Sequence, residues 1–198
     1  MLALRAGGIA SRNTSPQREQ GLRTTTPKRK RAPWEFTMTG GPLAYHITWT
    51  AYGTWLHGDD RGWIEGGGAG IQPPDESRLR VAEKRMTQAG VTFDEDQRTL
   101  IAQVIEDHHR IREWHIYALN VRSNHIHLVV AANRAPEEVM NQLKAWCSRK
   151  LSDAARLSDL PPAKKAGRRK WFTEHGSTKW INDEEYMENA VRYVLEGQ

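Results

Sequence analysis

The chain has 198 residues, a formal net charge of +5 and a single cysteine, Cys147. This length fits one domain with an appendage, and a lone cysteine excludes an internal disulfide and a cysteine-rich zinc site. No apolar run approaches the roughly 20 residues that a membrane-spanning helix needs, and no secretory signal opens the chain. We therefore expect a cytoplasmic protein with no membrane association.

Positive charge is concentrated at the start of the chain. Residues 1–37 hold eight Lys and Arg side chains against two acidic ones, which leaves a net charge of −1 for residues 38–198. The segment is also poor in large apolar side chains, so it cannot bury enough surface to offset its ordering entropy. We expect a disordered basic tail over residues 1–40, or a start placed upstream of Met38, and a single domain over residues 41–198. Any DNA affinity of this domain must come from local clusters of cations.

The first half of the domain predicts one strand and one helix around a long loop. Alternating residues predict a strand over 45–50. A Gly-rich stretch that reaches residue 74 is expected to be irregular, and loops of this length are usually functional or mobile. Asp94 and Gln97 then form the capping-box pattern of a helix start, and apolar side chains follow at helical spacing as far as Ile111.

The second half completes an α+β pattern. Strands are expected over 114–121 and 125–131, joined as a hairpin. Pro136 suits the first position of the next helix, a short strand is expected over 177–181, and Asn182 with Glu185 is expected to cap a final helix. The order predicts a ferredoxin-like βαββαβ core with an antiparallel sheet and a C-terminal helix.

Two histidines, His125 and His127, lie one residue apart in the expected strand 125–131. Alternate side chains of a strand share a face, so both imidazoles point the same way. Such a pair forms half of a site for a divalent metal, Mn²⁺ or Mg²⁺. Glu196 and Gln198 are the candidates for an additional oxygen ligand. The alternative is a pair of ordinary hydrogen-bonded histidines.

The final helix carries Tyr193, which could attack a DNA phosphate and form a covalent phosphotyrosine with release of a 3′-hydroxyl. The ordinary pKa of a tyrosine is ~10, so the phenol needs a metal or a nearby cation to ionise. Tyr186 lies seven residues earlier on the same helix face and is the competing nucleophile. For either tyrosine, packing is the alternative role.

Cations and tryptophans supply candidate DNA contacts. Residues 164–170 hold five cations in seven positions, which could clamp a phosphate backbone or form a solvated loop. Loop tryptophans could stack on unpaired bases, and Trp63 is a further candidate of this kind. Core packing is expected for Trp49, Trp114 and Trp146. The expected DNA-binding residues are Arg122, Asn124, Lys144, Arg149, Lys164, Lys165, Arg168, Arg169, Lys170, Trp55 and Trp180.

Taken together, the segment 124–127, the βαββαβ order and the helix with Tyr193 resemble single-tyrosine HUH transposases, in particular the REP-associated tyrosine transposases. Residues 52–56 and 175–178 are similar to one branch of these proteins. The resemblance covers about residues 43–198 and implies a single HUH transposase-like domain over residues 41–198.

The resemblance implies a metal-dependent transposase that cleaves and rejoins single-stranded or hairpin DNA through a 5′-phosphotyrosine. It assigns His125 and His127 as metal ligands and Tyr193 as the nucleophile. Relatives place a glutamine four residues after the tyrosine, whereas Gln198 comes five after it, a rotation of about 100° on a helix. Some relatives are dimers that exchange tyrosine helices and others are monomers, so a homodimer stays open.

The sequence also suggests two other functions. A hairpin-binding protein that is catalytically silent or domesticated would keep the same residues. The pattern His46-Ile47-Thr48 suggests a two-histidine RNA phosphoesterase, but that chemistry needs a second His-x-Thr/Ser, which His125-Ile126-His127 does not supply.

Overall fold

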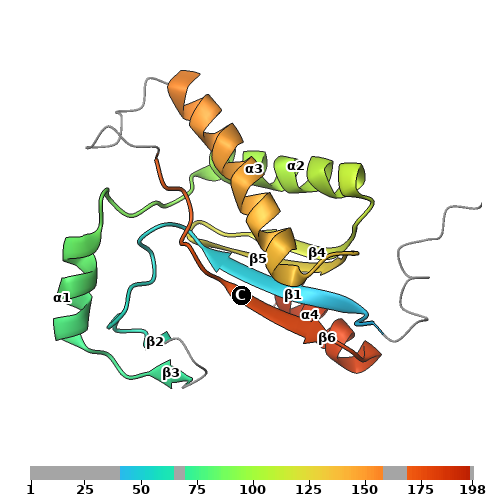
Figure 1. The fold of residues 1–198 in the computed structure, drawn as a ribbon, viewed down its shortest axis with the longest axis horizontal. Helices are drawn as coiled ribbons and strands as arrows, with labels where there is room; N and C mark the ends of the chain where they lie inside the picture. The colour runs from blue at the N-terminus through green and yellow to red at the C-terminus, as the bar shows by residue number, and fades with distance from the viewer. Residues whose placement is uncertain (1–40, 65–69, 158–168, 197–198) are drawn as a thin grey trace, which may run out of the picture. The chain divides into compact units, whose positions relative to one another are not determined.

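Four strands form one antiparallel sheet in the order β4-β5-β1-β6 (Figure 1). They are β1 (Ala44–Thr50), β4 (His115–Val121), β5 (His125–Ala131) and β6 (Ser177–Ile181). The structure is a computed structural model that describes residues 41–64, 70–157 and 169–196. With its helices in chain order, the sheet confirms the predicted ferredoxin-like core, in which β1 lies between β5 and β6.

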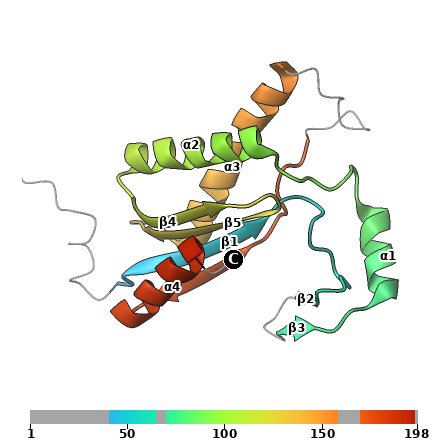
Figure 2. The same ribbon diagram turned by 180° about the vertical axis from the view of Figure 1, so that it is seen from behind.

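Helices α2 (Glu95–Arg112) and α3 (Pro136–Leu157) cover one face of the sheet, and α4 (Glu184–Glu196) lies on the other (Figures 1 and 2). The larger core forms under α2 and α3, where Ile47, Ile126 and Leu128 are fully buried. A smaller cluster joins Val129 of β5 to Val194 of α4. Because strand residues alternate between faces, His125 and His127 share the α4 face with Val129.

The predicted starts of two helices are confirmed. The Asp94 carboxylate accepts from the Gln97 amide nitrogen at 2.8 Å, and the Gln97 side chain accepts from the Asp94 amide, which completes the capping box. Pro136 occupies the first position of α3.

The predicted cap of the final helix was wrong by one residue. The carboxylate of Asp183, not the side chain of Asn182, accepts a 2.7 Å hydrogen bond from the Tyr186 amide nitrogen. The strand expected from Trp114 begins at His115; the amide of Trp114 still donates to the carbonyl oxygen of His109 at the end of α2.

The stretch after β1, expected to be irregular as far as residue 74, contains the two-residue strands β2 (Trp63–Ile64) and β3 (Ile71–Gln72), which pair with each other. Helix α1 (Glu76–Arg85) follows it, in a segment for which the sequence predicted no element. Asp75 caps α1 by accepting from the Arg78 amide nitrogen at 3.0 Å. This helix has no buried residue, so its sequence lacks the apolar face that predicts amphipathic helices.

None of the described helices is both long and apolar enough to cross a membrane. The basic tail expected over residues 1–40 lies outside the described residues.

Candidate active site

The histidine pair lies beside the central strand of the sheet. In the antiparallel register of β1 and β5, Thr48 is opposite His127 and Thr50 is opposite His125. The two imidazole rings are 4.8 Å apart between centroids and nearly perpendicular, at 88°. His127 is buried and His125 is half-buried. The rigid central strands thus fix both imidazoles side by side on the α4 face.

Hydrogen bonds at Nδ1 orient both rings. The side-chain oxygen of Asn124 lies 2.6 Å from Nδ1 of His125, and the Thr48 hydroxyl lies 2.9 Å from Nδ1 of His127. A carbonyl oxygen only accepts, so His125 carries its proton on Nδ1 and its lone pair on Nε2. When the Thr48 hydroxyl accepts a hydrogen bond from Nδ1 of His127, this ring also carries its proton on Nδ1 and its lone pair on Nε2. Metal-binding histidines characteristically donate their second ring nitrogen in this way.

Tyr193 lies next to these imidazoles. Its ring centroid is 5.6 Å from that of His127, with the rings perpendicular at 87°, and 6.0 Å from that of His46. The side chain is 46% exposed and therefore accessible from solvent. Tyr186, the competing candidate, is half-buried and packs against the hydrophobic cluster under α4.

Two kinds of contact hold α4 in place. Ala190 and Val194 are buried against Ala44 and Val129 of the sheet. The side-chain nitrogen of Asn120 donates to the carbonyl oxygen of Val194 at 2.7 Å. Because Val194 follows Tyr193, these contacts fix the backbone that carries the tyrosine.

Three residues of this site were not assigned to it from the sequence, where His46 and Thr48 suggested only a phosphoesterase pattern. Nε2 of His46 lies 3.4 Å from Nδ1 of His127, Thr48 bonds the same nitrogen, and Asn120 holds α4. Burial, with the nearby charge of Lys179, lowers the pKa of His46. The alternation of His46 and Thr48 with buried apolar residues was a usable signal, but their partners lie about 80 residues away, and only the register reveals them.

The donor set fits part of a transition-metal site. Two imidazoles side by side, each with a ring nitrogen available as a ligand, suit Mn²⁺ and similar ions. Among the residues that the structure describes, no group of three His, Cys, Asp or Glu side chains could hold a metal. Glu196 is exposed at the end of α4, and Gln198 lies outside the described residues.

Lys144 belongs to the protein interior and is removed from the candidate DNA contacts. Its side chain is 8% exposed, and its ammonium donates to the carbonyl oxygens of Thr173, Glu174 and His175 at 3.0, 3.3 and 3.0 Å. Burial lowers the pKa of Lys144 to about 8, against an upward influence of Glu174. The lysine therefore anchors the segment before β6 to α3.

Other candidate DNA contacts are divided between the two faces. Arg149 extends from α3, in the helix layer opposite α4, with its guanidinium 4.9 Å from the Trp146 ring centroid. Trp180 is 52% exposed and pairs with Tyr45, whose side chain points into the core under α2 and α3. Neither of these two therefore lies on the histidine face.

The remaining cations lie closer to the end of β1. Arg122 is half-buried in the turn before β5, where its amide donates to the carbonyl of His125 at 2.8 Å. Arg169 lies over the Trp171 ring at 4.4 Å, and Lys170 over the Tyr52 ring at 5.6 Å. The predicted contacts Lys164, Lys165 and Arg168 lie outside the described residues.

Three expectations for the tryptophans were wrong or need refinement. Trp63 is buried and donates to the carbonyl of Pro73 at 2.9 Å, so it is no stacking platform. Trp146, expected in the core, is 40% exposed. Trp55 is 39% exposed but donates through Nε1 to the Gly62 carbonyl at 2.6 Å, so only part of its ring is accessible.

The chain matches one family of known proteins and is similar to two solved structures. The model of the family described as "Transposase IS200 like" matches residues 84–194, more than half of the chain. The match includes both histidines and Tyr193. A comparison with curated proteins gives no match.

Two solved structures are similar to the chain. One is a REP-associated tyrosine transposase bound to a REP hairpin, with 11% identity, a TM-score of 0.40, and coverage of 78% of this chain and 64% of that one. The other is a protein of Deinococcus radiodurans R1 assigned as a transposase, with 15% identity, a TM-score of 0.39, and coverage of 79% and 91%. The chain thus spans less than two thirds of the first structure.

Proposed function

Because the chain belongs to the IS200-like transposase family, we propose that it cleaves and rejoins single-stranded DNA through Tyr193. The observation that carries the proposal is the 5.6 Å separation between the rings of Tyr193 and His127. A phenol beside two oriented imidazoles, on a face open to solvent, supplies a nucleophile and metal ligands at one point.

In the cleavage step, the phenolate oxygen of Tyr193 attacks the phosphorus of one phosphodiester. The new bond joins phosphorus to the tyrosine oxygen, and the bond from phosphorus to the 3′ oxygen of the preceding nucleotide breaks. The phenol proton passes to solvent, and the departing 3′ oxygen takes up a proton. Because the 5′-phosphotyrosine is itself a phosphodiester, attack by a 3′-hydroxyl reverses the step and rejoins a strand.

His125 and His127 would hold a divalent ion through Nε2, while Asn124 and Thr48 keep both rings in that orientation. When bound, Mn²⁺ or Mg²⁺ supplies Lewis-acid polarisation of a phosphate oxygen. We assign Gln198 as the third protein ligand and Arg122, Arg169 and Lys170 as phosphate contacts. Lys144 has no part in DNA binding.

Hairpin-containing DNA is the proposed substrate, with one chain or a homodimer as the active form. The second candidate is a hairpin-binding protein that does not cut. Both functions need the same fold and DNA surface, so covalent chemistry is what separates them.

The test is a search for a covalent adduct. The protein is incubated with a panel of labelled single-stranded hairpins and Mn²⁺ or Mg²⁺, and the products are separated on denaturing gels. Tyr193→Phe and His125→Ala should abolish the protein–DNA band, whereas Tyr186→Phe, the matched control on the same helix, should retain it.

Each result has a defined meaning. A band that is lost with Tyr186→Phe but kept with Tyr193→Phe would move the nucleophile two turns along α4 and overturn the assignment. Hairpin binding with no adduct across the panel would favour the non-cutting function.

A further inference from the structure

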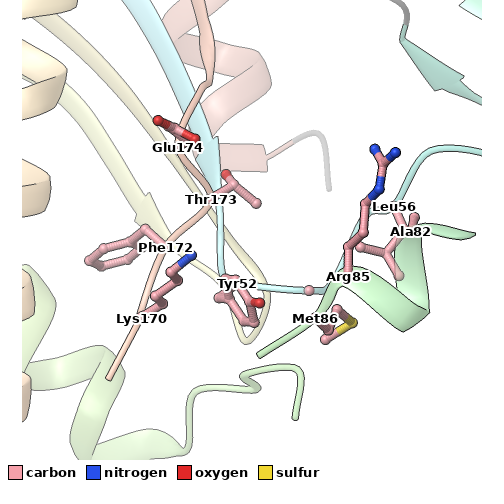
Figure 3. A pocket seen from close by; sticks show the side chains of 10 residues that line it. Tyr52, Leu56, Ala82, Arg85, Met86, Lys170, Phe172, Thr173 and Glu174 are labelled. Carbon is pink, nitrogen blue, oxygen red and sulfur yellow. The ribbon is translucent and has the colours of Figure 1, made fainter. Parts of the chain in front are cut away.

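A pocket of about 480 Å³ lies at the end of β1 (Figure 3). Its walls come from the loop after β1, the C-terminal end of α1 and the segment before β6. This volume falls within the range of roughly 300–1,000 Å³ that is typical of ligand sites.

The walls of the pocket are tied to each other by hydrogen bonds. The Gln88 side chain donates to the carbonyl of Lys170 at 2.7 Å and accepts from the amide of Lys170 at 2.9 Å. The Tyr52 hydroxyl accepts from the amide of Thr87 at 3.1 Å. The loop that follows α1 is thus fixed both to the segment before β6 and to the end of β1.

The lining combines a ring, apolar groups and charges. The ammonium of Lys170 lies 5.6 Å from the centroid of the Tyr52 ring, and Met86 adds apolar surface. The Phe172 ring is buried in the core against Trp49 and Phe93. Arg85 and Lys170 bring two positive charges to the pocket, against one negative charge from Glu174. Aromatic faces stack on bases and cations bind phosphates, so this lining suits a nucleotide.

The pocket adjoins the candidate active site through β1. Thr50 is opposite His125, and its hydroxyl lies 2.9 Å from the hydroxyl of Thr173, which lines the pocket. The amide of Ala51 donates to the carbonyl of Asn124 at 2.8 Å. The pocket is therefore linked through Thr50 and Thr173 to the strand position opposite His125.

One wall of the pocket lies outside the region that the family model matches. The match begins at residue 84, whereas Tyr52, Gly53, Leu56 and Ala82 precede it. The pocket thus combines residues that precede the matched region with residues inside it, Arg85, Met86 and the segment before β6.

We propose that this pocket binds one unpaired nucleotide of the DNA strand, adjacent to the phosphodiester that Tyr193 attacks. The base lies against Tyr52 and Met86, and its phosphate contacts Arg85 and Lys170. The inference rests on the proposed function for the identity of the ligand, single-stranded DNA. The binding itself needs neither metal nor cleavage. The pocket would make cleavage depend on the base at one position beside the cut.

The test uses the full chain with Tyr193→Phe, in EDTA, so that no cutting occurs. The probes are a fluorescein-labelled dodecamer of thymidine and the same strand with abasic residues in place of the nucleosides. Ala82→Trp fills the pocket from α1, and Arg85→Ala removes a cation. Lys84→Ala, an exposed neighbour that does not line the pocket, is the matched control.

We expect Ala82→Trp to weaken binding of the thymidine strand about ten-fold, the order of one base stacked on an aromatic side chain, and to leave binding of the abasic strand unchanged. Arg85→Ala should weaken binding of both strands more than Lys84→Ala does. Equal affinity of the parent protein for the two strands would overturn the proposal, as would unaltered binding by a folded Ala82→Trp protein. If Ala82→Trp does not fold, the affinities of Arg85→Ala and Lys84→Ala for the thymidine strand are compared. Equal affinities of these two variants would overturn the proposal.

Failure of the pocket and failure of the proposed function are distinguishable. If a protein that retains Tyr193 forms the adduct, and the pocket variants do not alter strand binding, the pocket proposal is wrong and the proposed transposase chemistry stands. If binding depends on the bases but no adduct forms, the pocket proposal stands and the proposed cleavage chemistry is wrong.

Discussion

The side-chain amide of Asn120 donates a 2.7 Å hydrogen bond to the carbonyl oxygen of Val194, the residue that follows Tyr193. Asn120 is also directly opposite His127 in the register of β4 and β5. One side chain therefore connects the strand that positions an imidazole with the helix that carries the nucleophile. The geometry of the site depends on this connection, because the hydrophobic cluster between α4 and the sheet is small.

Replacing Asn120 by Leu should uncouple the tyrosine from the histidines. The lost hydrogen bond should lower the free energy of unfolding by about 1 kcal/mol. The rate of adduct formation should fall about ten-fold or more, since small displacements of a reacting group are costly, while Mn²⁺ affinity stays unchanged. Adduct rates and hydrogen exchange of the α4 amides measure these effects. Glu188→Gln, at an exposed position of the same helix, is the control, and equal adduct rates for the two variants would contradict the prediction.

Thr48→Val should weaken metal binding without removing a metal ligand. The Thr48 hydroxyl bonds Nδ1 of His127 at 2.9 Å, and loss of such an orienting partner typically lowers metal affinity about 10- to 100-fold. Titration calorimetry with Mn²⁺ measures the affinity. In the metal-free protein, the ¹⁵N shifts of the His127 ring should show a smaller fraction protonated on Nδ1.

Thr50→Val is the matched control for this change. Its hydroxyl bonds Thr173 instead of a histidine, so its removal should leave both the metal affinity and the His127 tautomer as they are. An equal loss of affinity in the two variants would show that Thr48 acts through the strand and not through the ring.

The sequence predicts the frame of this site better than its contacts. Periodic apolar residues and the Asp94 capping box are local signals, and they define the strand and helix order correctly. The face shared by His125 and His127 follows from strand geometry alone. The pairing of His46 and Thr48 with His127 depends on the register of strands that are distant in the chain, and no local pattern encodes it.

Lys144 shows the opposite failure, in which a local pattern misleads. A lysine near Arg149 and Lys150 on one helix is typical of a basic patch. In the fold its ammonium is buried and bonds three carbonyl oxygens of a segment about 30 residues away. Helix α1 was missed for a related reason, since an exposed helix has no apolar face to reveal it.

Lys144→Met should therefore reduce stability and leave DNA binding intact. Loss of a buried charged donor should lower the free energy of unfolding at pH 7 by about 2–4 kcal/mol. The salt dependence of DNA affinity should not change, whereas Lys170→Met should reduce its slope by about 1. Chemical denaturation and binding at several salt concentrations test both statements. A reduced salt slope with Lys144→Met would return this lysine to the DNA surface.

The same lysine predicts a pH dependence of stability. Burial lowers its pKa in the folded protein from 10.5 to about 8, so between these values the unfolded chain binds more protons than the native one. Stability of the wild type relative to Lys144→Met should then rise with pH from about 8 to 10.5, by as much as about 3 kcal/mol at ~1.4 kcal/mol per pKa unit. Unfolding free energies of both proteins across this range measure the difference. A difference that falls with pH would mean that the three carbonyls raise the pKa of the ammonium more than burial lowers it.

A substitution at Gly53 tests whether strand binding by the pocket depends on the close packing of its wall. Gly53 and Gly70 have nearly the same left-handed backbone, with φ of 72° and 73°. A Cβ on Gly53 would overlap the Met86 side chain and lie 3.0 Å from the Cα of Gly90, whereas a Cβ on Gly70 would meet no atom of the described residues within 4 Å. Both alanine variants should lose about 1 kcal/mol or somewhat more from the backbone conformation, and Gly53→Ala a further 1–3 kcal/mol from overpacking.

The shared backbone conformation makes Gly70→Ala the control for Gly53→Ala. Because Gly53 and Met86 both line the pocket, the displacement in Gly53→Ala should also weaken binding of the thymidine strand and leave the abasic strand unaffected. Thermal unfolding and strand binding measured on the two variants separate packing from backbone strain. Equal stabilities would show that Met86 moves aside without cost, and the wall of the pocket would then be pliable instead of closely packed.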